Sequence, residues 1–311
     1  MGSLDAAALA VPKGSLVLVT GANGLVGSHI VDQYLYYGYR VRGTARDTDK
    51  NARLVDFFRA RYGKDSFELF KVPDMNAEGA YDDAVKGVSV FAHSASVVNL
   101  DHDPNNVIPP TIAGAVNALK AAYAEPSVKR FVLTSSSTAV VSIADGRAGI
   151  TASETTWNEE SVKAAWAPPP YTPERAWEVY GASKTQAEQE VWKYHEEHRR
   201  DRPDLVVNAE FFVDTADNGR LHVAAGILEN VKDRRILGFG GRWTLDRILE
   251  ILRRLEPGKA FPENFSGDED PNEVEGLDRS EQLLRDLGRP GWTTLEESIG
   301  GLVEDLRKSH P

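Results

Sequence analysis

Short apolar runs alternate with amphipathic stretches through the first two-thirds of the chain. Unbroken apolar runs are typical of strands buried on both faces of a parallel sheet, and apolar residues at every third or fourth position predict helices. The predicted strands are Leu16–Thr20, Tyr39–Thr44, Phe67–Val72, Val88–Ala92 and Val128–Ser135. Helices are predicted after the first strand and at Ala52–Tyr62 and Thr111–Ala124. This order predicts an α/β fold with a doubly wound parallel sheet.

The alternation stops between Val140 and Pro173. This segment is polar, contains Trp157 and Trp166, and carries three consecutive prolines at Pro168–Pro170. Long segments without regular structure are uncommon inside a compact domain and are often functional. Two interpretations stay open: an excursion beside the functional site, or a solvated loop.

The remaining pattern predicts a helix over Pro173–Arg200, a sixth strand at Leu205–Asn208 and a mostly helical C-terminal third. In that third we expect a helix at Trp243–Leu255, an acidic loop from Pro262 to Asn272, and amphipathic helices at Ser280–Leu287 and Thr294–Leu306. The sequence Gly288-Arg289-Pro290-Gly291 separates the last two helices and is a stop-and-turn signal.

A turn rich in glycine follows the first strand. It reads Gly21-Ala22-Asn23-Gly24-Leu25-Val26-Gly27, and helical spacing continues from His29. Glycines permit a tight turn and close approach of the backbone to a pyrophosphate, which is stabilised by the amides and positive dipole end of the next helix. The strand before, the helix after and a second strand make this pattern specific for a dinucleotide. The residues expected to hold it are Gly21, Asn23, Gly24, Leu25, Val26 and Gly27.

The second strand ends in arginine. An NAD-preferring fold usually has Asp or Glu here to bind the ribose 2′-hydroxyl, but this stretch reads Arg40-Val41-Arg42-Gly43-Thr44-Ala45-Arg46. A guanidinium suits a 2′-phosphate, and a charge-assisted hydrogen bond contributes about 1.5–3 kcal/mol. We therefore predict NADPH (NADP) rather than NADH as the cofactor, with Arg46 on the phosphate and Arg40 as an ordinary solvated charge.

Composition narrows the functional classes. The chain has 36 basic and 47 acidic residues and a net charge of −11, which argues against a nucleic-acid-binding surface. It has no cysteine, so a disulfide framework and a thiolate nucleophile are excluded. No secretory signal, myristoylation motif or membrane span is recognisable. We expect a cytoplasmic monomer or homodimer that acts on a small molecule and binds neither nucleic acid nor membrane.

A tyrosine and a lysine stand four residues apart in Tyr180-Gly181-Ala182-Ser183-Lys184, near the start of a helical stretch. Residues at this spacing share one face of a helix. The ammonium of Lys184 favours the phenolate form of Tyr180, which suits Tyr180 to act as a general acid for a carbonyl group. The spacing also occurs by chance in many helices, so it needs independent support.

That support comes from hydroxyls that follow the fifth strand, in Thr134-Ser135-Ser136-Ser137. Ligands of an open α/β sheet bind beyond the carboxyl ends of its strands, so a hydroxyl there can meet a tyrosine of the next helix. We predict that Ser136 donates to the substrate oxygen while Tyr180 protonates it as hydride arrives from nicotinamide. Ser135 and Ser137 remain alternatives for the role of Ser136.

Taken together, these stretches resemble the extended short-chain dehydrogenase/reductase superfamily. They are most similar to its NADPH-dependent aldehyde and carbonyl reductases of fungal type, relatives of plant dihydroflavonol and cinnamoyl-CoA reductases. The stretches that carry the resemblance are Val19–Gly27, Val41–Arg46, Phe131–Ser136, Tyr180–Lys184 and Leu287–Trp292. The resemblance implies an NADP-binding Rossmann domain at residues 12–209 and a smaller, mostly helical substrate-binding portion at residues 210–311.

The resemblance also assigns individual residues. It implies Ser136, Tyr180 and Lys184 as the catalytic residues, with Asn117 supporting the site from the long helix. It places Asp74 and Met75 near the adenine. Along the dinucleotide it places Ala92, His93, Ala95, Ser96 and Thr134, together with Tyr180 and Lys184. For His93, a packed histidine at a strand end is an equal alternative.

The implied reaction is the NADPH-dependent reduction of aldehydes and ketones, including β-ketoester-like carbonyls, to alcohols, with Tyr180 as general acid. A nucleotide-sugar epimerase on the same scaffold and a non-catalytic NADP sensor are the alternatives. Tyr180 with Lys184 argues against the sensor, and Arg46 argues against the epimerase, which usually retains NAD.

The chain departs from its relatives after the sixth strand. Relatives have a loop there that covers the nicotinamide and then a wall of the substrate pocket, but here Leu205–Ala209 runs directly into Glu210–Asp214. Either the printed sequence omits residues or the chain has truly lost tens of them. We favour the first, because a direct join leaves no crossover after a parallel strand. A true deletion predicts adenine-end binding with poor turnover.

No metal site is predicted. The sequence His195-Glu196-Glu197-His198 has ligands at one-turn spacing but lies at a polar helix end, where a solvated face is the better interpretation. The acidic run Gly267–Asp270 lacks the spacing of a calcium loop.

Overall fold

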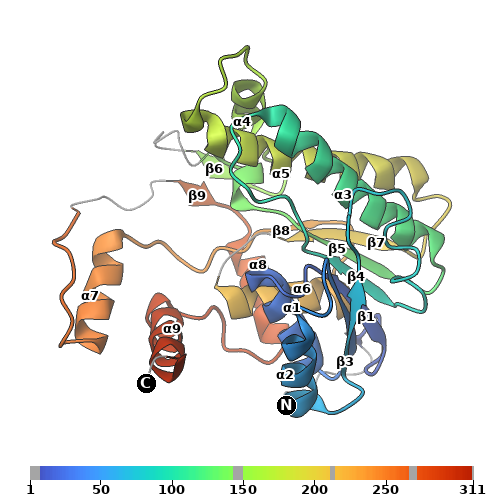
Figure 1. The fold of residues 1–311 in the computed structure, drawn as a ribbon, viewed down its shortest axis with the longest axis horizontal. Coiled ribbons are helices and arrows are strands. Elements are labelled where there is room, and N and C mark those ends of the chain that lie inside the picture. The colour runs from blue at the N-terminus through green and yellow to red at the C-terminus, as the bar shows by residue number, and fades with distance from the viewer. Residues whose placement is uncertain (1–7, 143–149, 211–213, 266–271, 310–311) are drawn as a thin grey trace.

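A seven-stranded sheet forms the centre of the molecule (Figure 1). The computed structural model describes residues 8–142, 150–210, 214–265 and 272–309. The strands lie in the order β3-β2-β1-β4-β5-β7-β8, and every neighbouring pair is parallel. Their bounds are Leu16–Thr20 (β1), Arg40–Ala45 (β2), Phe67–Lys71 (β3), Val90–His93 (β4), Arg130–Thr134 (β5), Val206–Glu210 (β7) and Arg235–Ile236 (β8). The predicted doubly wound sheet is confirmed.

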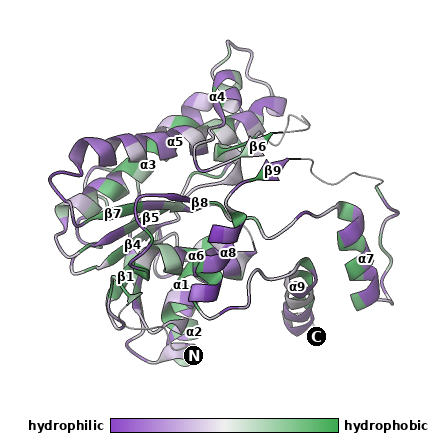
Figure 2. Ribbon diagram, turned by 180° about the vertical axis from the view of Figure 1, so that it is seen from behind, coloured by the Kyte–Doolittle hydropathy of each residue, from purple (hydrophilic) through white to green (hydrophobic). Residues whose placement is uncertain are grey.

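Helices cover both faces of this sheet. On one face lie α1 (Leu25–Tyr36), α2 (Ala52–Tyr62), α6 (Thr215–Ile227) and α8 (Leu277–Asp286), which share one hydrophobic core with the strands. On the other face lie α3 (Pro104–Ala124) and α5 (Ala176–His198), with a second core. Hydrophobic residues concentrate in the strands, and hydrophilic residues concentrate on the outer helices (Figure 2). Because both faces are covered, the strands are buried in the way that their unbroken apolar runs predict.

Helix α3 begins well before its predicted start at Thr111. The Asp103 carboxylate caps it by accepting a hydrogen bond of 2.9 Å from the backbone N–H of Asn105. Pro104 follows at a position where no backbone N–H is needed. The cap therefore outweighs the two prolines inside the helix, and the predicted boundary was wrong.

The segment at residues 140–173 is tied to the sheet. Its described part contains β6 (Thr151–Ala152), which pairs with β9 (Glu273–Val274), and α4 (Glu159–Ala165), which packs on α5. The Trp157 ring lies 3.8 Å from the guanidinium carbon of Arg235, at the end of the sheet. These contacts support an excursion held beside the sheet rather than a solvated loop.

Helix α6 is the crossover from β7 to β8. The two strands pair in parallel with Ala209 opposite Arg235, and α6 lies between them in sequence. The expectation that a direct join after the sixth strand leaves no crossover was therefore wrong. Because α6 satisfies the connection, a chain that lacks tens of residues at this point can still complete its sheet; residues 211–213 themselves lie outside the described part.

The C-terminal region divides between two locations. Helix α8 packs on α6 in the main core, where Leu283 and Leu284 are buried. Helices α7 (Leu245–Leu255) and α9 (Leu295–Ser309) instead pack on each other around Ile251 and Ile299, and lie to one side of the sheet (Figure 1). Since β8 completes the sheet, we propose that the Rossmann domain extends past the predicted boundary at 209/210 to Ile236.

Two glycines let α1 and α6 approach each other closely. A Cβ atom at Gly226 would overlap the hydroxyl of Tyr34, and one at Gly219 would lie 2.7 Å from the carbonyl oxygen of His29. Tyr34 cannot easily move away, because it is buried and donates a hydrogen bond of 2.8 Å to the carbonyl of His222.

We expect Gly226→Ala to lower the free energy of unfolding by about 1–3 kcal/mol, because the new methyl overpacks this contact. Gly301→Ala is the matched control. Gly301 lies in α9 with no atom near its would-be Cβ, so alanine there should raise stability by up to about 1 kcal/mol. Urea unfolding of both variants checks this, and equal effects would contradict the close packing.

Candidate active site

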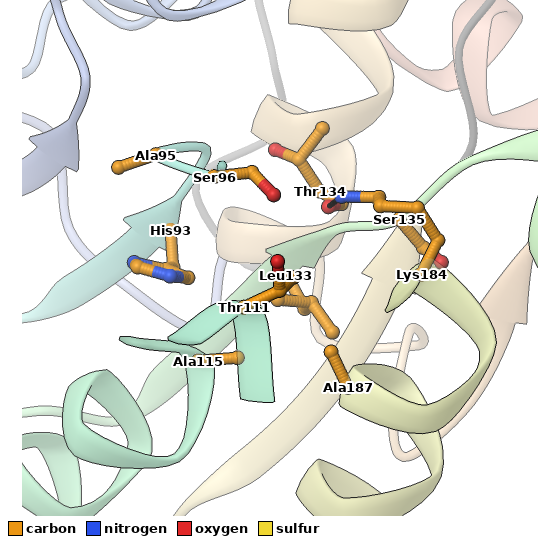
Figure 3. Close-up of a pocket in the computed structure, with 10 residues that line it drawn as sticks. All are labelled: His93, Ala95, Ser96, Thr111, Ala115, Leu133, Thr134, Ser135, Lys184 and Ala187. Atoms are coloured by element: carbon orange, nitrogen blue, oxygen red, sulfur yellow. Dashed lines mark hydrogen bonds between the residues drawn. The ribbon is translucent and has the colours of Figure 1, made fainter. Parts of the chain in front are cut away.

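A pocket opens at the carboxyl ends of β4 and β5, between α3 and α5 (Figure 3). Ligands of doubly wound folds bind beyond this edge, near the point where the strand order reverses. Here the reversal lies between β1 and β4. The lining residues are His93, Ala95, Ser96, Thr111, Ala115, Leu133, Thr134, Ser135, Lys184 and Ala187.

Lys184 is a buried amine in this pocket. Its Nζ donates a hydrogen bond of 3.0 Å to the backbone carbonyl of Thr134, the last residue of β5. Burial lowers the pKa of Lys184 from 10.5 to about 8, and the Glu188 carboxylate opposes this in part. In the described part of the chain Nζ has only this one hydrogen-bond partner, so its remaining hydrogens are available to a ligand.

Tyr180 lies one helical turn before Lys184 and is half-buried. Its ring meets the ring of Trp177 edge-to-face, with centroids 6.1 Å apart. Among the described residues, no hydrogen bond joins its hydroxyl to Lys184 or Ser136. The phenol is therefore free to turn toward a substrate, and its predicted role as the acid stays a prediction.

The three serines after β5 differ in their partners. Ser135 donates a hydrogen bond of 2.5 Å to the Glu188 carboxylate, which occupies its proton. The Oγ of Ser136 accepts hydrogen bonds from the backbone N–H and the hydroxyl of Thr138, at 3.2 and 2.9 Å. Among the residues that the structure describes, no acceptor takes the hydroxyl hydrogen of Ser136, so that hydrogen stays available to a ligand. Ser137 is exposed, so these contacts favour Ser136 as the donor to a substrate oxygen.

Glu188 and Arg235 form a buried ion pair below the serines. The Nε of Arg235 lies 2.7 Å from Oε1 of Glu188, and both side chains are buried. Arg235 also donates to the carbonyls of Glu154 and Thr156, which joins β8 and the 140–173 excursion to α5. The sequence analysis did not identify this pair. The position of Glu188, one turn after Lys184, is the signal that could have suggested it.

A second buried cluster lies on the α6 side of the site. His222 donates from Nδ1 to the Asn218 carbonyl at 2.9 Å, so its Nε2 accepts the hydrogen of the Thr134 hydroxyl at 2.7 Å. Burial lowers the pKa of His222 to about 4 and raises the pKa of the neighbouring Glu210 well above its ordinary value. His222 is therefore neutral at working pH, and burial makes the charged form of Glu210 unfavourable. Neither residue was identified from the sequence.

The glycine-rich turn has the predicted geometry. Gly21 adopts a left-handed backbone, with φ of 63°, and a Cβ at Gly27 would overlap the carbonyl of Gly21. Helix α1 begins at Leu25, directly after the turn, and Asn23 and Leu25 are exposed. The free amides of a helix N-terminus thus face the edge where a pyrophosphate is predicted to bind.

The arginines of β2 have different surroundings. Arg42 pairs with Glu68 at 2.7 Å and donates to the carbonyls of Ala84 and Lys86, while Arg40 donates to the carbonyl of Gly14. Arg46 follows the end of the strand and is exposed. Within the described ranges it makes no hydrogen bond or ion pair, so it is the arginine available to a phosphate.

His93 has the contacts of a packed histidine. The Thr20 hydroxyl accepts from the amides of Ser94 and Ala95, so it donates its own hydrogen to Nδ1 of His93 at 3.0 Å. The ring packs on Phe131, and burial lowers the pKa of His93 to about 3. The imidazole also lines the pocket, so a contact with the dinucleotide through the ring stays a prediction.

Asn117 contacts the loop after β3. Its side-chain amide donates to the carbonyls of Met75, Asn76 and Ala77, at 3.3, 3.0 and 3.2 Å. Asp74, in the same loop, is exposed. Asn117 therefore holds the loop that carries the two residues predicted to lie near the adenine. Its support of the catalytic residues, and the roles of Asp74, Met75, Ala92, Ala95 and Ser96, stay predictions.

The described ranges contain no group of three or more His, Asp or Glu side chains placed to hold a metal ion. His195 instead bonds the Tyr123 hydroxyl at 2.7 Å and lies 3.2 Å from the Asp233 carboxylate. The acidic run Gly267–Asp270 lies outside the described residues. In the part of the chain that the structure describes, no helix is long and apolar enough to cross a membrane.

Comparisons with known proteins agree with this fold. A model of the NAD dependent epimerase/dehydratase family matches residues 17–205. The chain is 38% identical to aldehyde reductase 2 of Sporidiobolus salmonicolor, over 97% of this chain and 98% of the relative, and 32% identical to the ketoreductase adrE of Penicillium rubens, over 95% and 98%. Gre2 of Candida albicans, solved in complex with NADPH, superposes with a TM-score of 0.78 at 24% identity, covering 96% of this chain and 100% of that chain.

The alignment with aldehyde reductase 2 runs over 349 positions, whereas this chain has 311 residues. The relative therefore has residues that find no counterpart here. Both explanations of the departure after the sixth strand, residues omitted or residues lost, account for this difference.

Lys184 makes the stability of the free protein depend on pH. Below pH 8 the folded state holds a buried charge, whereas the unfolded amine titrates near 10.5. As pH rises from 8 to 10.5, the free energy of unfolding of the native chain should therefore increase relative to that of Lys184→Met, by about 1.4 kcal/mol per pH unit. Urea unfolding of both proteins between pH 7 and 9.5 measures this, and parallel curves would show that burial does not lower the pKa of Lys184.

Proposed function

The chain belongs to the NAD dependent epimerase/dehydratase family, and from that premise we propose that it is an NADPH-dependent oxidoreductase that reduces aldehydes and ketones to alcohols. The observation that carries this proposal is the buried amine of Lys184, one turn from the half-buried Tyr180 and bonded to the strand that Ser136 follows. Relatives named aldehyde reductase and ketoreductase support reduction as the direction of the reaction, and aldehydes and ketones as the class of substrate. β-Ketoester-like carbonyls are part of the proposed range.

The residues present fit a pyridine dinucleotide phosphate. The turn from Gly21 to Gly27 can close tightly because a Cβ at Gly27 would overlap the Gly21 carbonyl and Gly21 has a left-handed backbone, and Arg46 is available to a 2′-phosphate. The complex of Candida albicans Gre2 with NADPH supports the same choice of cofactor. Thr134, Ser96 and Lys184 line the pocket in which the reactive end would lie.

NADPH, when bound, supplies hydride to the carbonyl carbon. Ser136 donates its free hydroxyl hydrogen to the carbonyl oxygen and holds it in place. Tyr180 gives its phenolic proton to the same oxygen as negative charge develops there. Lys184 uses its available N–H groups to hold hydroxyl groups of the cofactor, and its positive charge favours the phenolate that remains on Tyr180.

A true deletion after β7 would affect turnover. A segment that covers the reactive end excludes water and positions substrate, and a true deletion would remove the stretch that the resemblance places there. In that case we expect the adenine end to bind well and the chemical step to be slower than full enclosure would allow.

A nucleotide-sugar epimerase is the second candidate, because the family description includes epimerases. Turnover of a nucleotide sugar without net loss of NADPH absorbance would favour it.

We expect Tyr180→Phe to lower turnover by about 10²–10⁴, which is the usual contribution of a general acid, while NADPH affinity stays nearly intact. The assay follows the loss of NADPH absorbance with an aldehyde, and fluorescence titration gives the cofactor affinity. Tyr36→Phe, at the exposed far end of α1, is the control. Equal turnover in the Tyr180 variant and the native protein would remove Tyr180 from the mechanism.

We expect Arg46→Ala to weaken NADPH binding by about 10- to 100-fold, since a charge-assisted hydrogen bond contributes about 1.5–3 kcal/mol, and to leave NADH binding nearly unchanged. Arg40→Ala, on the same strand, is the matched control and should alter neither. Titration with both cofactors measures the two affinities. An unchanged ratio between them would reject the phosphate role of Arg46.

A further inference from the structure

One face of α5 runs from the pocket out to solvent. Ala187, Lys184, Tyr180 and Trp177 follow one another at steps of three or four residues, so they share this face. Exposure rises along it: Ala187 is 5% exposed, Lys184 is 8% exposed, Tyr180 is half-buried and Trp177 is 49% exposed. Ala187 and Lys184 line the pocket. The face therefore leaves the pocket past Tyr180 and reaches solvent at Trp177.

Trp177 is the aromatic side chain next to the phenol. The two rings meet at 89° with centroids 6.1 Å apart. This contact fixes one edge of the indole against Tyr180 and leaves about half of the side chain in water. What distinguishes Trp177 from the other exposed aromatic side chains is its position beside the Tyr180 phenol, where its exposed surface can pack on a ligand.

The loop after β4 brings apolar side chains beside α5. Ser96 lines the pocket, and the next residue, Val97, packs in the same cluster as Val179 and Ala182 of α5. The loop therefore runs beside the first turns of α5, where Tyr180 also lies. It continues into Val98, which is 67% exposed. The surroundings of Tyr180 thus include apolar side chains of this loop as well as Trp177.

We propose that Trp177 determines substrate specificity by packing on an aromatic ring attached to the reacting carbonyl. The preferred substrates are then aryl aldehydes and aryl ketones rather than short aliphatic ones. This inference rests on the proposed function. The Trp177 and Tyr180 rings lie 6.1 Å apart, so a substrate whose carbonyl oxygen meets the Tyr180 hydroxyl has the indole as a neighbour of its attached ring. Aromatic pairs prefer edge-to-face or offset arrangements, which the exposed face of Trp177 permits.

The experiment compares benzaldehyde with propanal in the native protein, Trp177→Ala and Trp177→Phe. We expect Trp177→Ala to lower kcat/KM for benzaldehyde about 10-fold, mainly through a higher KM, and to lower that for propanal by about 2-fold at most. Trp177→Phe keeps an aromatic ring and should restore most of the benzaldehyde preference. Trp166→Ala is the matched control, because Trp166 is 41% exposed and donates to Gln186 on α5.

An equal fall for both aldehydes in Trp177→Ala would overturn the inference, since a tryptophan that only positions Tyr180 gives that result. Unchanged kcat/KM values for both aldehydes in Trp177→Ala would overturn it as well and would leave the proposed function standing. If neither benzaldehyde, propanal nor any other carbonyl compound supports NADPH oxidation by the native protein, the proposed function fails. This inference then fails with it. NADPH affinity is measured in each variant, and a loss of affinity identifies a folding defect. If Trp177→Ala has such a defect, the ratio of kcat/KM for benzaldehyde to that for propanal in Trp177→Phe decides the question.

Discussion

The hydrogen bond from the Lys184 amine to the carbonyl of Thr134 is the interaction on which the site depends. It fixes α5 to the last residue of β5, directly before the serines that include the predicted substrate donor. Burying an amine is unfavourable, and this burial lowers its pKa to about 8. The fold tolerates that cost because β4, β5 and β7 lie side by side and α5 packs across them. Burial of the Lys184 amine thus lowers the stability of the folded protein, and in return it holds the amine in place before any ligand binds.

The sheet architecture and most element bounds were predictable from the sequence, whereas the individual side-chain contacts between distant elements were not. Strand β1 and helix α2 have the predicted bounds, because unbroken apolar runs and helical spacing are local signals. The spacing of Tyr180 and Lys184 is likewise local. The pair between Glu188 and Arg235 joins α5 to β8, and no spacing rule connects residues so far apart. The contacts of Asn117 with the loop after β3 depend on tertiary packing in the same way.

A true deletion after β7 would affect the sheet and the pocket differently. The sheet is complete, because α6 returns the chain to β8 and packs closely on α1 through Gly219 and Gly226. On the substrate side, a true deletion would remove the stretch that the resemblance places there, and specificity would then depend on side chains that the remaining elements present. Trp177 on α5 is in that position. The residues proposed to bind the cofactor, in the turn after β1 and at Arg46, therefore differ from Trp177, the residue proposed to set substrate preference.

The most direct test of this account is a crystal structure of the chain with NADPH bound. The account predicts the nicotinamide ring over the pocket lined by Ser96 and Thr134, with the Lys184 amine within hydrogen-bond distance of the adjoining ribose and the Tyr180 hydroxyl facing the reactive ring carbon. A structure in which the dinucleotide is held only at its adenine end, or in which the Tyr180 hydroxyl points away from the ring, would contradict it.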